Sequence, residues 1–396
     1  MRQHSKISKA SAQLKIARIS TVAFFVETQL KQQIKTMVSE GMAVTVIASE
    51  ADLKNSIQGV TYKPIRIPRE ISVFDDLLAV FKLTFFFRSN RFDIVHSTTP
   101  KAGLLTAIAG YIARVPVRIH TYTGQVWVEK KGLVRLLSIW GDRLIGLLNT
   151  QCYADSPSQV RFLLKNKILS KKRIDCLGFG SLAGVDLARF NSGNYSEADR
   201  RLLRTELSVP AESKVLTFIG RCTRDKGVAE LLKAFEHVIQ MGVNLTLLVV
   251  GPVEGDVLDE FNHLDKLTQK YLRLVGHSSV PERYLSITDL LVLPSYREGF
   301  GTVVIEAAAM GVPAIGTRIY GLQDAIVDNK TGCLVEPKNV QELAHAILSL
   351  VSDDKRRHDL GTAALDRVKQ CFSDTYVNRL LFDEYQRLSL NAGIAR

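Results

Sequence analysis

Short apolar runs alternate with segments of helical period along almost the whole chain. Buried strands of a parallel sheet read as continuous apolar runs, whereas the helices that cover them repeat apolar positions three and four residues apart. The alternation therefore predicts an α/β fold with helix-covered parallel sheets. A first series predicts strands at 14–20, 44–47, 61–66, 93–96, 117–121, 151–154 and 173–177, with helices at 29–40, 72–89, 101–113 and 131–148.

A stretch at 178–194 is rich in residues that break regular structure, and a second series follows it. Its strands are predicted at 214–220, 245–250, 272–275, 290–294, 313–317 and 332–335, with helices at 228–241, 257–271, 300–310 and 340–351. We therefore expect two facing Rossmann-like domains, 1–188 and 189–372, with a cleft between the carboxyl ends of their strands. The segment 373–396 contains a helix whose apolar stripe predicts that it packs back across the domain junction.

The charge of the chain is unevenly distributed. Residues 1–188 carry 27 Lys and Arg against 13 Asp and Glu, whereas residues 189–396 carry 25 against 27. A basic first half indicates an anionic partner, and nucleic acid or an acidic membrane surface would both satisfy it. The apolar run at 22–26 is too short for a signal-peptide core, and no run reaches the roughly 18 apolar residues of a membrane span. We expect a cytoplasmic protein, soluble or peripheral, and the scattered cysteines predict neither disulfides nor a zinc site.

Two carboxylates, Glu298 and Glu306, lie eight positions apart around the predicted start of a helix. Gly299 and Gly301 leave the unpaired N–H groups of the first helical turn open to an anion, and Thr302 adds a hydroxyl donor. The alternative is an ordinary strand–turn–helix connection, in which Glu298 complements the helix dipole and Glu306 is solvated.

Arg221 and Lys226 follow the predicted strand 214–220 and so lie at the carboxyl edge of the second sheet. A planar guanidinium and a mobile ammonium both suit phosphate oxygens, although two solvated turn residues near Asp225 would have the same spacing. The sequence contains no Asp-x-Asp pair of the kind that holds a divalent ion against a diphosphate. The pattern therefore favours a metal-independent diphosphate site.

Together, these residues resemble the retaining glycosyltransferases of family 4, whose Glu-x7-Glu signature matches Glu298 and Glu306. The resemblance implies the GT-B fold and a nucleotide-sugar donor held mainly by the second domain, with no cofactor and no metal. It implies that Arg221 and Lys226 neutralise the diphosphate, that Glu306 accepts hydrogen bonds from the ribose and that Glu298 contacts the transferred sugar. The implied donor-binding residues are Gly220, Arg221, Lys226, His277, Glu298, Gly299, Phe300, Gly301, Thr302 and Glu306.

The same resemblance places His120 beside the donor sugar, although a histidine at a strand end is often only a structural hydrogen-bonding group. The implied catalytic residues are then Glu298, His120, Arg221 and Lys226. The residues expected on the acceptor side are His96, Thr98, Lys101, His120 and Gly124.

The segments 97–105 and 119–127 resemble a bacterial subgroup that builds O-antigen, capsule and related glycans. This implies transfer of an N-acetylhexosamine or a deoxy relative from a UDP-sugar to a saccharide on undecaprenyl diphosphate. The enzyme would then lie on the inner face of the cytoplasmic membrane. The basic, apolar segment 130–148 with Trp140 fits contact with an anionic membrane surface, although a core helix of the first sheet is favoured. Packing is likewise favoured for the aromatic run at 85–87.

Four rival functions compete with this interpretation. A nucleic-acid-binding protein would show aromatic residues interleaved with basic ones, and no such motif is present. A nucleotide-sugar epimerase or a glycogen-type phosphorylase would share the architecture, but the set of Arg221, Lys226, Glu298 and Glu306 favours a transferase. A dehydrogenase is disfavoured, because no Gly-x-Gly-x-x-Gly follows the first strand.

Overall fold

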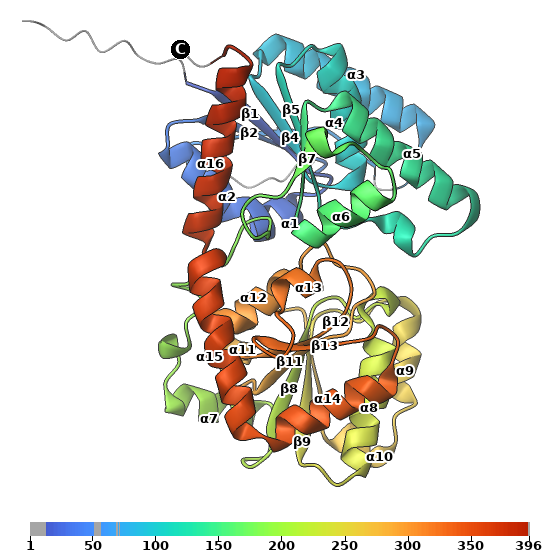
Figure 1. Cartoon of the computed structure of the whole chain (residues 1–396), viewed down its shortest axis with the longest axis vertical. Helices are drawn as coiled ribbons and strands as arrows, with labels where there is room; N and C mark the ends of the chain where they lie inside the picture. Colours follow the sequence, from blue (N-terminus) through green and yellow to red (C-terminus); the bar gives the residue numbers. More distant parts are fainter. Residues whose placement is uncertain (1–12, 51–56, 69, 71, 395–396) are drawn as a thin grey trace, which may run out of the picture.

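The computed structural model describes residues 13–50, 57–68, 70 and 72–394, and it contains two parallel sheets that are each covered by helices (Figure 1). Both sheets have the strand order of a Rossmann-like domain, so the predicted α/β fold with two such domains is confirmed. The signal-peptide argument rests partly on residues 1–12, which lie outside the described residues.

The first sheet has the order β3-β2-β1-β4-β5-β6-β7, and all of its pairs are parallel. Its strands are β1 (Lys15–Ile19), β2 (Ala43–Ala48), β3 (Thr61–Pro64), β4 (Ile94–Ser97), β5 (Val117–Tyr122), β6 (Gln151–Ala154) and β7 (Ile174–Asp175). The helices of this domain are α1 (Ala23–Phe25), α2 (Lys31–Ser39), α3 (Val73–Asn90), α4 (Pro100–Ile112), α5 (Gly132–Leu148) and α6 (Pro157–Lys165).

The second sheet has the order β10-β9-β8-β11-β12-β13, again with parallel pairs. Its strands are β8 (Lys214–Ile219), β9 (Leu245–Val250), β10 (Leu272–Gly276), β11 (Leu290–Leu293), β12 (Ala314–Thr317) and β13 (Gly332–Val335). The helices from this point on are α7 (Glu197–Glu206), α8 (Val228–Gln240), α9 (Leu258–Asn262), α10 (Lys266–Lys270), α11 (Pro281–Leu285), α12 (Thr302–Ala309), α13 (Leu322–Ala325), α14 (Val340–Ser352), α15 (Asp354–Cys371) and α16 (Asp374–Asn391).

The single helix predicted at 257–271 is wrong, because the chain breaks there into α9 and α10. Asp265 is the reason: its side chain accepts a hydrogen bond from the Thr268 N–H at 2.6 Å and so caps a new helix. Helices α6 and α7, which the apolar period did not indicate, also begin at side-chain caps, Ser156 and Ser196. Local polar capping therefore decides the helix boundaries that hydrophobic period leaves open.

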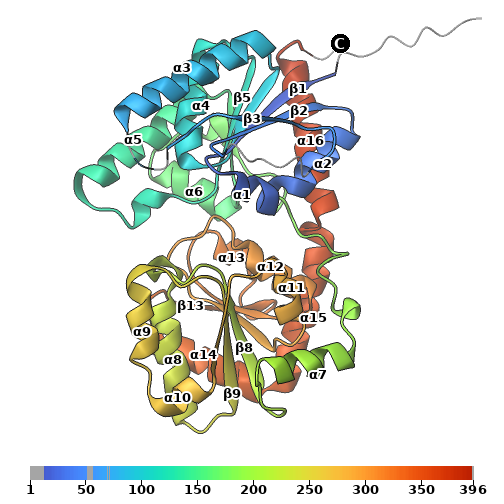
Figure 2. The ribbon, with the colours of Figure 1, turned by 180° about the vertical axis from the view of Figure 1, so that it is seen from behind.

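Helix α16 returns from the second domain to the first, where it lies along α2 (Figures 1 and 2). Leu381 and Tyr385 are buried in the core beside the first sheet. The Tyr385 hydroxyl accepts a hydrogen bond from the Arg18 guanidinium at 2.7 Å, and the Tyr153 hydroxyl donates to Glu384. The last helix therefore ties the two domains together.

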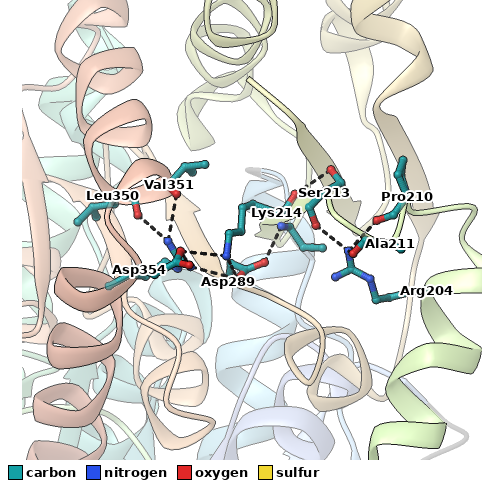
Figure 3. Close-up of polar contacts among 11 residues, drawn as sticks. Arg204, Pro210, Ala211, Ser213, Lys214, Asp289, Leu350, Val351 and Asp354 are labelled. Carbon is teal, nitrogen blue, oxygen red and sulfur yellow. Dashed lines mark hydrogen bonds and ion pairs between the residues drawn. The ribbon is translucent and has the colours of Figure 1, made fainter. Parts of the chain in front are cut away.

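Charged groups also gather at the amino-terminal edge of the second sheet, where β8 begins (Figure 3). Lys214 Nζ lies 2.9 Å from an Asp354 carboxylate oxygen, and the Arg204 guanidinium donates to three backbone carbonyls between residues 210 and 213. Asp289 accepts a hydrogen bond from the Val215 N–H at 2.8 Å. These contacts anchor α7, α15 and β8 at the edge opposite the carboxyl ends of the strands, where ligands bind in such sheets.

Candidate active site

Strands β8 and β11 end at one cavity of about 420 Å³, which contains Arg221, Lys226 and Glu298. A short turn after β8 carries Lys226 and ends at Gly227, whose φ is +69°. A Cβ atom at Gly227 would lie 2.1 Å from the Pro294 carbonyl oxygen, so only glycine allows this turn to pack against the end of β11. Two separate loops are thereby fixed around one cavity.

An ion pair between Lys226 and Glu298 lies at the centre of this cavity. Lys226 Nζ is 2.5 Å from Glu298 Oε1, and the Ser295 hydroxyl donates to the same oxygen at 2.9 Å. The two charged side chains are only 20% and 14% exposed, so the pair is largely shielded from solvent. This pair leaves the ammonium facing the cavity and holds the carboxylate in a fixed position.

Helix α12 begins at the same cavity. Its N-cap is Gly301, with φ +88°, and no side chain of the described residues caps the first turn. Phe300, next to it, is buried against Phe372 with ring centroids 5.1 Å apart. The N–H groups of the first turn and the positive end of the helix dipole are therefore available to an anion, as the sequence predicts.

Glu306 lies one helical turn further along α12, in an adjoining cavity of about 200 Å³ that also contains Arg189. Thr28 and Thr302 line both cavities, so the two lie side by side. Burial raises the pKa of the Glu306 carboxyl to about 7, and Arg189 acts against that shift. Glu306 is therefore partly buried and lines a cavity, rather than fully solvated as in the alternative interpretation.

Arg221 lies at the rim of the larger cavity rather than in its depth. Its guanidinium is 58% exposed and donates to Glu254 at 3.1 Å. Arg297, which sequence reasoning missed, also lines the cavity and donates to Asp225 at 3.0 Å. Burial alone would raise the pKa of Asp225, but the Thr223 hydroxyl and the neighbouring cations hold it below its usual value. The rim therefore carries two guanidiniums, each of which is paired with a carboxylate.

The first domain closes the cavity with Thr123 and Asp155, both of which sequence reasoning missed. Asp155 follows β6 directly and is 7% exposed, and its Oδ1 has no hydrogen-bond partner among the described residues. Burial raises the pKa of this carboxyl to about 8. A Cβ atom at Gly299 would lie 2.7 Å from Asp155 Oδ2 and from the Thr123 carbonyl oxygen, so the glycine lets the two domains approach each other. The position of Asp155 at the end of a strand was the signal in the sequence that could have identified it as a site residue.

The two histidines expected near the acceptor are both buried, each with an exposed fraction of 1%, and neither lines the large cavity. His120 Nδ1 is 2.9 Å from the Ser97 hydroxyl, and burial lowers the pKa of His120 to about 3. His96 contacts Arg18 and Tyr385 at 2.7 and 2.6 Å, and burial lowers its pKa as well. Their roles toward the substrates stay predictions.

The remaining predicted residues are spread around the cleft. Lys101 is held by Asp76 at 2.6 Å, and Thr98 is buried beneath Thr123. Gly124 faces the Gly299 backbone across the domain junction. His277 packs its ring against Phe24, with centroids 6.1 Å apart, and lies outside the cavity lining, as does Gly220.

The described residues contain neither a cluster of metal ligands nor a helix that could span a membrane. Among the residues that the structure describes, no group of three or more His, Cys, Asp or Glu side chains could hold a metal ion. Within the same residues, no helix has both the length and the apolar character needed to cross a bilayer.

Known proteins resemble this chain over most of its length. Residues 26–178 match a family model described as a glycosyl transferase 4-like domain, and residues 199–367 match glycosyl transferases group 1. The capsular polysaccharide biosynthesis glycosyltransferase CapM of Staphylococcus aureus is 30% identical over 351 residues, 88% of this chain and 90% of CapM. An Escherichia coli UDP-Gal:alpha-D-GlcNAc-diphosphoundecaprenol alpha-1,3-galactosyltransferase is 23% identical over 404 residues, 95% of this chain and 99% of that protein.

Solved structures share the fold of nearly the whole chain. Anabaena HepE in complex with UDP and glucose superposes with a TM-score of 0.79 at 18% identity, over 94% of this chain and 100% of HepE. WaaG, a glycosyltransferase involved in lipopolysaccharide biosynthesis, gives 0.70 at 14% identity, over 95% of this chain and 99% of WaaG. At these identities the likeness shows the fold.

Proposed function

Since this chain belongs to the group 1 glycosyl transferases of family 4, with the GT-B fold, we propose that it is a retaining hexosyltransferase that uses a UDP-sugar. The observation that carries the proposal is the cavity in which Arg221, Lys226 and Glu298 meet the start of α12. HepE, a structural neighbour, has been solved with UDP and glucose, which supports a uridine nucleotide as the donor. The reaction needs no cofactor, because the nucleotide-sugar itself is activated.

The diphosphate of the donor would bind between Lys226, Arg221 and the first-turn N–H groups of α12. These groups match an anion in both charge and hydrogen-bonding direction. The nucleoside would extend into the adjoining cavity, where Glu306 would accept hydrogen bonds from the ribose hydroxyls. Because the two cavities lie side by side and share Thr302, one extended ligand could reach from one to the other.

The reaction would break the bond between the anomeric carbon and the phosphate oxygen and form a bond from the same carbon to an acceptor hydroxyl oxygen. Negative charge develops on the departing phosphate, where Lys226, Arg221 and the helix terminus would stabilise it. The acceptor hydroxyl would attack from the face that the diphosphate leaves, and its proton would pass to a phosphate oxygen. Glu298 is paired with Lys226 and hydrogen-bonded by Ser295, which fits a residue that orients the sugar rather than a nucleophile.

For the substrates we propose an N-acetylhexosamine or a deoxy relative as the transferred sugar and an undecaprenyl-diphosphate-linked saccharide as the acceptor. CapM is named for capsular polysaccharide biosynthesis, and the Escherichia coli relative is named for a diphosphoundecaprenol acceptor. Both names favour surface polysaccharide assembly. A lipid-linked acceptor would place the reaction at the inner face of the cytoplasmic membrane.

A panel of UDP-, GDP- and dTDP-sugars, each with and without lipid-linked saccharide, tests the proposal through the nucleotide that is released. We expect release from a UDP-sugar only when acceptor is present, and a loss of that release in Glu306→Ala. Conversion of a UDP-N-acetylhexosamine without acceptor would instead identify an epimerase. Salt-sensitive oligonucleotide binding without UDP binding would favour a nucleic-acid-binding protein. Either of these results would overturn the transferase assignment.

A further inference from the structure

Helix α3 presents an apolar face to solvent. Phe74, Leu77, Phe81 and Phe85 are between 65% and 79% exposed, and their spacing of three and four residues places them on one side of the helix. The opposite side packs normally, since Ala79, Leu83 and Phe87 are buried in the domain core. The aromatic run at 85–87 is therefore divided: Phe87 packs inward, whereas Phe85 points outward.

Helix α5 also exposes an apolar face to solvent. In this helix, which the structure describes throughout, only Asp142, Ile145 and Gly146 are buried. Its exposed apolar residues are Leu133, Val134, Leu136, Leu137, Trp140, Leu144 and Leu147. The Arg143 guanidinium lies 5.5 Å from the Trp140 ring centroid, in a cation–π contact at the surface. The interpretation of 130–148 as a core helix is thus wrong for the outer side of α5.

The two helices belong to one layer, because each packs against α4 and all three lie on the same side of the first sheet (Figures 1 and 2). Their exposed faces therefore form one surface, which we call the α3–α5 surface. Soluble monomers rarely expose an apolar patch larger than a few hundred Å² unless it binds something. Two neighbouring helices with thirteen exposed apolar residues between them exceed what scattered surface leucines explain.

The exposed charged residues of the α3–α5 surface are mostly cations. Lys82, Arg88 and Arg135 are exposed, as are Lys130 and Lys131 in the turn before α5. Glu129 is the exposed acid of that turn.

The acidic side chains of the two helices are turned away from this surface. Asp76 is paired with Lys101, Asp75 accepts a hydrogen bond from Ser72, and Asp142 is buried and accepts one from Trp127 at 2.7 Å. An apolar face bordered by exposed cations fits the boundary between anionic headgroups and acyl chains.

We propose that the α3–α5 surface docks on an anionic lipid bilayer, with its phenylalanines, leucines and Trp140 inserted at the headgroup boundary. A second copy of the chain fits less well, because a two-fold interface would bring the cationic borders of both copies together. The proposal goes beyond the transferase reaction and does not depend on the identity of the donor.

The two tryptophans make the docking measurable. Trp127 is 1% exposed and held by Asp142, whereas Trp140 is 64% exposed, so a change of environment on docking is reported by Trp140. Phosphatidylglycerol vesicles added at low salt should sediment the full-length protein and shift its emission to shorter wavelength. Phosphatidylcholine vesicles, or high salt, should weaken both effects.

The test variant is Phe81→Glu combined with Leu137→Glu, and the matched control is Leu202→Glu, an equally exposed leucine on α7 of the other domain. We expect at least a tenfold loss of partitioning to phosphatidylglycerol vesicles in the double variant and none in the control. Circular dichroism and UDP binding in solution should be unchanged in both, which separates this proposal from the proposed reaction. Wild-type protein that ignores these vesicles, or a dimer in solution that the double variant dissociates, would overturn the proposal.

Discussion

Replacing Lys226 by methionine tests the charge at the centre of the candidate site. Methionine keeps most of the aliphatic stem but removes the ammonium, which lies 2.5 Å from Glu298 and is 20% exposed. A charge-assisted hydrogen bond contributes about 1.5 to 3 kcal/mol, which corresponds to a loss of roughly 10- to 150-fold in affinity. We expect the loss for UDP to lie toward the upper end, because the variant leaves Glu298 as an unpaired anion beside the diphosphate.

The measurement is calorimetric titration with UDP, followed by kcat/KM for nucleotide release once a donor is known. The fall in kcat/KM should exceed the fall in UDP affinity, because charge on the phosphate grows in the transition state. Lys233→Met is the matched control: this lysine is on the following helix, is 61% exposed and lies 4.0 Å from Glu260. It should bind UDP like the wild type.

A double variant separates the two parts of this effect. Adding Glu298→Gln to Lys226→Met removes the unpaired carboxylate, so part of the lost UDP affinity should return even though the ammonium is absent. Unchanged UDP affinity in Lys226→Met, or an equal loss in Lys233→Met, would refute the assignment of this pair to the diphosphate.

Three further changes test other parts of the site. The pKa of Glu306 is about 7, so wild-type UDP affinity should rise as pH increases through 7, because the Glu306 carboxylate that accepts hydrogen bonds from the ribose then forms. In calorimetry, Glu306→Gln should remove most of this pH dependence and leave the affinity for pyrophosphate unaltered. The pKa of Asp155 is about 8 when folded and about 4 when unfolded, so folding stability should fall as pH rises from 4 to 8, by up to about 1.4 kcal/mol per unit. Asp155→Asn should remove that slope in thermal melts across this range, and a melting profile identical to wild type would contradict it. Gly227→Ala would bring a Cβ to 2.1 Å from the Pro294 carbonyl; it should lower Tm by several degrees and weaken UDP binding, whereas Gly242→Ala, which has open space, should affect Tm alone.

The most buried strands were predictable because they are covered on both faces and therefore read as largely apolar runs. Leu245–Val250 is buried at every position, and its predicted and observed bounds coincide. Helix boundaries were less predictable, because single polar caps such as Asp265 decide them. In the site, Lys226, Glu298 and the start of α12 could be brought together from the sequence, since their spacing around one loop and one helix start is local. Arg297 was missed, and the predicted His277 lies outside the cavity lining.

Residues that meet only across the domain junction could not be predicted in the same way. Asp155 and Gly299 are far apart in sequence, and their approach depends on how the two domains face each other. The burial of His120 and His96 could not be predicted from the sequence either, because a histidine at a strand end can point into the cleft or into the protein core. The contacts with Ser97, Arg18 and Tyr385 show that both point into the protein.

The proposed docking surface and the candidate site are linked by α4. This helix begins at Pro100, directly after β4, so its first turn lies at the carboxyl edge of the first sheet, where Thr98 and Lys101, which we predict on the acceptor side, are found. Helices α3 and α5 pack on either side of it. Lys101 bridges the two regions, because it lies in the first turn of α4 and pairs with Asp76 of α3. A saccharide whose lipid stays in the bilayer would therefore need to extend only along one helix layer to reach the cleft, and binding of α3 and α5 to that bilayer would hold the cleft at a fixed height above it.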